Sequence, residues 1–150
     1  MKKFDFNNKK ILVVEDTETS SRFFDAALSR TNATLLWAQD GDEAIEVFDN
    51  NDVDLVLLDL NLFTTSGFDV LRHIRSKDKN TPVIVQTAYI LAGEEQTSFE
   101  LGASDFIAKP IKLNQLLETV NKFLGEKRFG FLHLLCEKMF GFLHIRNEIL

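Results

Sequence analysis

Short runs of consecutive hydrophobic residues alternate along this chain with segments in which hydrophobic and polar residues follow a helical period. The runs are rich in Val, Ile and Leu, which is typical of strands buried on both faces of a parallel sheet. We expect strands at residues 11–14, 34–38, 55–58, 82–86 and 104–108. Strands that alternate with amphipathic helices indicate an α/β fold with helices on both faces of the sheet.

The segments between the strands each carry one hydrophobic face. We expect helices at residues 17–30, 41–49, after Ser66-Gly67, at 94–101 and at 112–124. The last helix should turn Leu113, Leu116, Leu117, Val120 and Phe123 inwards and end at Gly125. Five parallel strands and five helices predict a doubly wound, flavodoxin-like fold, in which ligands bind beyond the carboxyl ends of the strands.

Acidic residues follow two of the predicted strands. Glu15 and Asp16 come directly after the first strand, and Asp59 directly after the third. Parallel strands deliver these three carboxylates to the same edge of the sheet. Like charges raise one another's pKa, so such a cluster indicates a bound cation or a reaction that uses it. Oxygen ligands with water in the shell suit Mg²⁺.

The two remaining strands bring further polar groups to this edge. Thr87-Ala88 follows the fourth strand and Lys109-Pro110 follows the fifth. Carboxylates, a hydroxyl, a backbone amide and one lysine together make a plausible phosphoryl site. In the order and spacing of these positions, residues 9–124 resemble the receiver domain of two-component response regulators. We therefore expect a receiver domain at residues 1–125.

The resemblance implies a role for each carboxylate. Asp59 would be the phosphoacceptor, forming an acyl phosphate with a phosphoryl group from the phosphohistidine of a sensor histidine kinase or a histidine phosphotransfer protein. Asp16 and Asp59 would ligate Mg²⁺, with Glu15 acting mostly through water and the backbone carbonyl of Asn61 supplying another oxygen. The metal would offset the repulsion between the nucleophile and the incoming group.

The resemblance also implies a switch. The Thr87 hydroxyl and the Ala88 amide would bond the phosphoryl oxygens, and Lys109 would pair with Asp59 and then with its phosphoryl group. Phe106 stands where the family has a rotating aromatic residue. Without a hydroxyl to hold an outward rotamer, we expect it to stay buried.

Two loops bear on the detail of this site. Leu62-Phe63 replaces the Met-Pro of many receivers, which changes the expected shape of the loop after Asp59. Asn61 and Tyr89 occupy the positions that, in the family, modulate attack by water on the phosphoaspartate.

Composition narrows the class of protein further. The 150 residues are 45% hydrophobic, enough for one domain with one sizeable core. The formal charge of −6 argues against a nucleic-acid partner. The start of the chain is too polar for a signal peptide and the single cysteine fits a reducing compartment, so we expect a cytoplasmic protein.

Residues 126–150 form a separate hydrophobic segment with an eleven-residue repeat, in which Phe129-Gly-Phe-Leu-His recurs from Phe140. Eleven residues are close to three helical turns, so we expect an amphipathic helix with one wide apolar sector. Pairing of two chains through this helix, as a homodimer, is the expectation we favour. Folding back on the receiver and lying on a membrane are the alternatives, although a net charge of +1 is low for an anionic surface.

The function we expect is that of a signalling phosphoacceptor with only intrinsic phosphorylation and dephosphorylation chemistry, not an enzyme. One alternative is a degenerate receiver that binds partners without phosphorylation. Another is a phosphatase of the haloacid-dehalogenase class, but that class needs a second aspartate where this chain has Asn61. The kinase, the downstream target, and whether the receiver is free-standing or derives from a hybrid kinase stay open.

Overall fold

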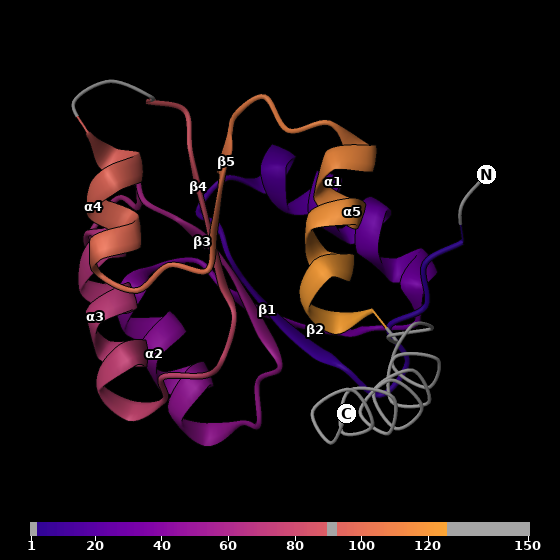
Figure 1. Cartoon of the computed structure of the whole chain (residues 1–150), viewed down its shortest axis with the longest axis horizontal. Coiled ribbons are helices and arrows are strands. Elements are labelled where there is room, and N and C mark those ends of the chain that lie inside the picture. The colour runs from indigo at the N-terminus through magenta and orange to yellow at the C-terminus, as the bar shows by residue number, and fades with distance from the viewer. Residues whose placement is uncertain (1–2, 90–92, 126–150) are drawn as a thin grey trace, which may run out of the picture.

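Five strands form one parallel sheet in the computed structural model, which describes residues 3–89 and 93–125. The spatial order is β2-β1-β3-β4-β5 (Figure 1). This order confirms the doubly wound, flavodoxin-like fold. The strands are β1 (Lys10–Val14), β2 (Thr34–Ala38), β3 (Leu55–Asp59), β4 (Val83–Thr87) and β5 (Asp105–Ala108).

Helices cover both faces of the sheet, with α1 and α5 on one face and α2, α3 and α4 on the other (Figure 1). Three helices, α2, α4 and α5, lie within one residue of the ranges expected from the sequence, and α3 begins at Gly67, next to the expected start. Helix α1 ends two residues earlier than expected, and a 3-10 turn follows it. The elements are α1 (Glu18–Leu28), η1 (Ser29–Thr31), α2 (Gly41–Asn50), α3 (Gly67–Lys77), α4 (Glu94–Glu100) and α5 (Leu113–Leu124).

The turn from β3 to α3 is fixed by a cap and by a close backbone contact. The Ser66 side chain accepts a hydrogen bond from the Phe68 amide and caps α3. A Cβ on Gly67 would lie 2.5 Å from the carbonyl oxygen of Asp59, so only glycine allows this approach. The sequence Ser66-Gly67 therefore holds α3 directly against the end of β3.

Hydrophobic residues on the two faces of the sheet form two cores. One lies under α1 and α5, and the other lies under α2 and α3. The strands contribute alternate residues to each, as a sheet covered on both faces requires. On α5 the buried stripe is Leu116, Val120 and Leu124.

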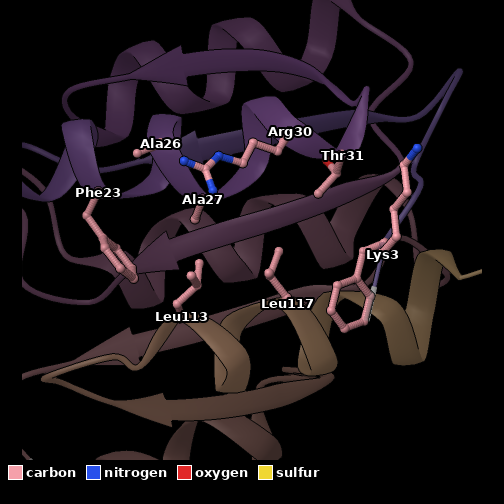
Figure 2. A pocket seen from close by; sticks show the side chains of 9 residues that line it. Lys3, Phe23, Ala26, Ala27, Arg30, Thr31, Leu113 and Leu117 are labelled. Carbon is pink, nitrogen blue, oxygen red and sulfur yellow. The ribbon is translucent and has the colours of Figure 1, made fainter. Parts of the chain in front are cut away.

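Leu113 departs from the prediction that it faces the core, because it is 44% exposed. It lines a groove of about 460 Å³ between α1 and α5, together with Leu117 and Phe23 (Figure 2). On the α1 side the groove is lined by Ala26 and Ala27, whose short side chains do not reach across to the first turn of α5. The prediction for Leu113 was wrong because helical periodicity does not report the size of the residues opposite.

The predicted tail helix at residues 126–150 lies outside the described residues, so its structure and the pairing of two chains stay predictions. Within residues 3–89 and 93–125, no helix is long and apolar enough to span a membrane.

Candidate functional site

Three carboxylates meet at the carboxyl edge of the sheet, as the sequence predicts. Glu15 and Asp16 follow β1, and Asp59 is the last residue of the neighbouring strand β3. One oxygen from each of the three lies within 4.8 Å of the others. Glu15 is 2% exposed and Asp59 is 3% exposed, so most of this charge lies out of reach of solvent.

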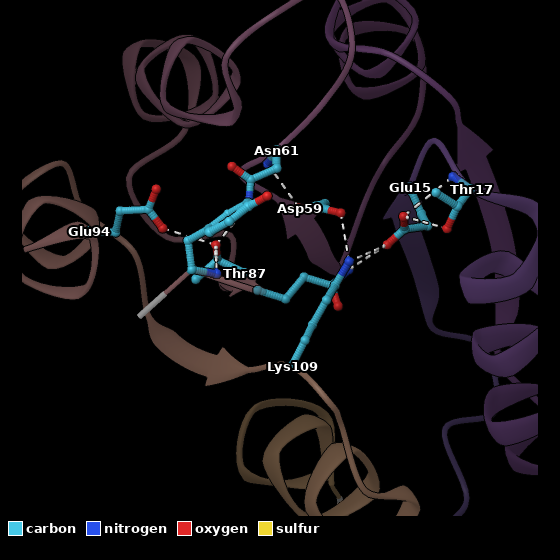
Figure 3. A network of polar contacts seen from close by, with 9 residues as sticks. Glu15, Thr17, Asp59, Asn61, Thr87, Glu94 and Lys109 are labelled. Atoms are coloured by element: carbon cyan, nitrogen blue, oxygen red, sulfur yellow. Dashed lines mark hydrogen bonds and ion pairs between the residues drawn. The ribbon is translucent and has the colours of Figure 1, made fainter. Parts of the chain in front are cut away.

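Lys109 places its ammonium group inside this cluster. Its Nζ lies 2.7 Å from Oδ2 of Asp59 and 3.2 Å from Oε2 of Glu15 (Figure 3). The backbone amide of Lys109 donates to the carbonyl of Thr87 at 2.8 Å, which extends the pairing of β5 with β4 up to the site. The predicted pairing of Lys109 with Asp59 is confirmed.

Burial and charge shift two pKa values here. Burial raises the pKa of Glu15, and the negative charge of Asp59 raises it further, against the opposing effects of Lys109 and the Thr17 amide. Burial by itself lowers the pKa of Lys109, but the hydrogen bond and charge of Asp59 and the charge of Glu15 outweigh it. The net pKa of Lys109 is therefore raised. In the resting protein this lysine is a firmly held cation that partly neutralises the cluster.

The Thr87 side chain is the centre of a second network. Thr87 is fully buried, and its hydroxyl accepts from Nδ2 of Asn61 at 2.8 Å and from the Tyr89 amide at 3.1 Å. The same hydroxyl donates to Oε2 of Glu94 at 2.9 Å (Figure 3). The backbone amide of Asn61 donates to Oδ1 of Asp59 at 2.9 Å, so this network is joined to the carboxylate cluster.

Two members of the site were missed by reasoning from the sequence. Glu94, in the first turn of α4, reaches back to Thr87 across a loop whose course no hydrophobic pattern specifies. Gln86 looked like an ordinary strand residue, yet it is buried and its Nε2 lies 3.5 Å from Oε2 of Glu15. Its Oε1 has no hydrogen-bond partner among the described residues. A polar residue inside an otherwise apolar strand was the available signal.

The other predicted site residues lie around the rim. Ala88 is exposed and Tyr89 is 63% exposed, so the two residues directly after β4 face solvent although Thr87 is buried. Phe63 is 92% exposed in the loop after Asp59. Phe106 is only partly buried and packs on the core under α2 and α3. This partial exposure fits the place of β5 at the edge of the sheet, and the expectation that Phe106 stays buried during switching stays a prediction.

The donor atoms of this site fit a hard divalent cation. All three charged donors are carboxylates, and oxygen ligands are those that Mg²⁺ and Ca²⁺ take in proteins. Burial disfavours the charged form of Glu15, and a cation would relieve that penalty.

A comparison with known protein families identifies the family to which this fold belongs. Residues 11–121 match the model of the response regulator receiver domain. The chain therefore belongs to the receiver-domain family of two-component signalling. It is 28% identical to the polar-differentiation response regulator DivK of Brucella anthropi, over 79% of this chain and 98% of DivK.

Solved structures agree with this membership. The response regulator TrrA of Thermotoga maritima, in complex with Mg²⁺ and BeF, is 31% identical with a TM-score of 0.71, over 77% of this chain and 99% of that one. The receiver domain of the sensor histidine kinase PA1611 from Pseudomonas aeruginosa has a magnesium ion coordinated in its active-site cleft. It is 27% identical with a TM-score of 0.72, over 79% of this chain and 98% of that one.

Proposed function

We propose that this protein accepts a phosphoryl group on Asp59 from the phosphohistidine of a sensor histidine kinase or a histidine phosphotransfer protein. The observation that carries the proposal is the Asp59 carboxylate itself, almost buried, 2.7 Å from Lys109 and within 4.8 Å of two more carboxylates. A structural aspartate does not need that surrounding, whereas a nucleophile that receives an anionic group does.

In the proposed reaction one Asp59 oxygen attacks phosphorus and forms a new P–O bond. The P–N bond of the donor breaks, and its electron pair stays on the imidazole nitrogen. The product is an acyl phosphate on Asp59 and a free histidine on the donor. Lys109, held between Asp59 and Glu15, is positioned to pair with the charge that arrives.

Asp16, Asp59 and Glu15, with the backbone carbonyl of Asn61, are the residues that would hold Mg²⁺. The metal, when bound, supplies positive charge that offsets repulsion between the carboxylates and the phosphoryl oxygens. Both magnesium-containing relatives support this assignment, since they share the receiver fold.

The phosphoryl group would then act as a signal. The Thr87 hydroxyl and the Ala88 amide would bond its oxygens, and the change would pass to Phe106 and the surface around α4, β5 and α5. Hydrogen bonds to charged groups contribute about 1.5–3 kcal/mol each, enough to shift a balance between two conformers. Asn61 and Tyr89 would set how readily water attacks the acyl phosphate.

In this proposal the protein is a cytoplasmic signalling switch, not an enzyme that turns over a substrate. Neither alternative function is favoured by the comparisons. A degenerate receiver usually loses the acidic pair, the phosphoacceptor or the lysine, and all four positions are filled here. A phosphatase of the haloacid-dehalogenase class would need an aspartate in place of Asn61.

The proposal is tested by incubating the protein with Mg²⁺ and acetyl phosphate and then measuring its intact mass. We expect one added phosphoryl group in the wild type, none in Asp59→Asn, and one in the matched control Asp52→Asn, which changes an exposed acid far from the site. An unchanged mass shift in Asp59→Asn would show that the phosphoacceptor is another residue. No mass shift in the wild type would favour the degenerate receiver.

A further inference from the structure

The Thr87 hydroxyl is fully engaged in this structure. A hydroxyl has one proton to donate and two lone pairs to accept with. Asn61 Nδ2 and the Tyr89 amide take the two acceptor sites, at 2.8 Å and 3.1 Å. The single proton is donated to Oε2 of Glu94, at 2.9 Å.

This arrangement conflicts with bonding to a phosphoryl group. The oxygens of a phosphoryl group are acceptors, so Thr87 can bond one of them only with the same proton that it now donates to Glu94. Asp59 and Glu94 lie on different sides of Thr87 (Figure 3). The hydroxyl therefore has to leave one acceptor in order to reach the other.

We propose that Glu94 is a positioning residue that holds the resting state: its carboxylate retains the Thr87 hydroxyl in the unphosphorylated protein and competes with the phosphoryl group for that proton. This inference rests on the proposed phosphorylation of Asp59 and adds a residue to it. Among the described residues, Thr87 is the one side chain that donates a hydrogen bond to the Glu94 carboxylate. The carboxylate is thus committed to this contact and not to an ion pair elsewhere in the described part of the chain.

Release of this contact would be transmitted into α4. Glu94 lies in the first turn of that helix, and its backbone carbonyl accepts from the fully buried Ser98 hydroxyl at 2.6 Å. The side chain of Glu94 therefore links the end of β4 to the first turns of α4. A phosphoryl group on Asp59 also adds negative charge on the Asp59 side of Thr87, which disfavours the neighbouring Glu94 carboxylate in its resting place.

The test compares Glu94→Ala and Glu94→Gln with the control Glu95→Gln. Glu95 is the next residue of the same helical turn and is exposed, so its variant matches the loss of an acid at the start of α4. The probe is beryllium fluoride with Mg²⁺, a stable mimic of a bound phosphoryl group, titrated by calorimetry. Mg²⁺ alone is titrated in parallel.

We expect Glu94→Ala to bind the mimic about tenfold more tightly than the wild type, which corresponds to about 1.4 kcal/mol. Glu94→Gln keeps an acceptor oxygen without the charge, so its affinity for the mimic should lie between those of the wild type and Glu94→Ala. Glu95→Gln should match the wild type, and affinity for Mg²⁺ alone should be the same in all. In a Thr87→Ala background, Glu94→Ala should have no effect, because the contested hydroxyl is gone.

Equal affinity of the wild type and both Glu94 variants for the mimic would overturn the inference while leaving the proposed function in place. An increase that persists in the Thr87→Ala background would also overturn it, because Glu94 would then act by another route. A wild type that binds Mg²⁺ but neither the mimic nor a phosphoryl group would overturn the proposed function, and this inference with it.

Discussion

Lys109→Met should destabilise the protein strongly without metal and only slightly with it. The substitution keeps an unbranched apolar side chain of similar length but removes the ammonium group from between Asp59 and Glu15. Those two residues and Asp16 would then form a cluster of three carboxylates with no cation from Lys109 inside it.

The magnitude follows from the geometry. Oxygens of these carboxylates lie no more than 4.8 Å apart, so two unit charges on them repel by at least about 3.5 kcal/mol at an effective dielectric constant of about 20. Removing one partner of a buried ion pair typically costs about 3–5 kcal/mol. Because the Lys109 side chain is 24% exposed, we expect the lower end, about 3 kcal/mol. With saturating Mg²⁺ another cation balances the cluster, so the loss should fall to about 1 kcal/mol, the size of an ordinary hydrogen bond.

The assay is urea unfolding at neutral pH, followed by fluorescence of the single tryptophan, Trp37, which lies on β2. Each protein is measured in EDTA and in excess Mg²⁺. Lys112→Met is the control, because Lys112 is an exposed lysine close to Lys109 along the chain. A loss of stability that is the same with and without Mg²⁺ would refute the reasoning, as would a loss in EDTA no larger than that of the control.

Four further predictions concern single sites. Asp16→Ala should weaken Mg²⁺ binding in calorimetry and abolish phosphorylation while being at least as stable as the wild type without metal, because a repelling charge is removed; equal metal affinity would contradict this. Thr87→Ala should still accept a phosphoryl group but lose the phosphorylation-dependent NMR shifts near Phe106, and undiminished shifts would exclude Thr87 as the relay. Hydrogen bonds from the Asn80 backbone amide and the Thr81 hydroxyl lower the pKa of Asp78. The Asp78 carboxylate therefore stabilises the fold at pH values above its ordinary pKa of 3.8, and this stabilisation is lost as the pH falls through the pKa of the folded protein. The stability difference between wild type and Asp78→Ala in urea should therefore shrink in acid, and a constant difference would be evidence against the hydrogen bonds as its cause. Truncation after residue 125 should convert a dimer to a monomer in light scattering without changing phosphorylation, whereas a full-length protein that is already monomeric at high concentration would favour the fold-back alternative.

The sheet and the carboxylate cluster could be predicted from the sequence because both follow from strand ends. A buried parallel strand is a short apolar run, and the residue after it must lie at the carboxyl edge of the sheet. Neighbouring strands are about 4.8 Å apart, so Glu15 and Asp59 had little freedom to lie elsewhere. The positions of Thr87 and Lys109 at this edge follow in the same way from the ends of β4 and β5. The observed register of β3 with β4 and of β4 with β5 agrees with these positions.

Contacts made by the helices could not be predicted in the same way. The position of Glu94 depends on the path of the loop between β4 and α4, and the exposure of Leu113 depends on which residues of α1 lie opposite. The hydrophobic period of a sequence predicts which face of a helix is buried, but not how far the helix is shifted along its axis or how large the neighbouring residues are.

The residues of the proposed switch differ in what fixes their positions. The residues proposed to bind the phosphoryl group stand at strand ends, where the sheet fixes them, whereas the residue inferred to compete with it stands in the first turn of α4, which follows a loop. If Glu94 holds the resting state as we infer, a single substitution in the first turn of α4 changes that state and leaves the phosphoacceptor chemistry in place.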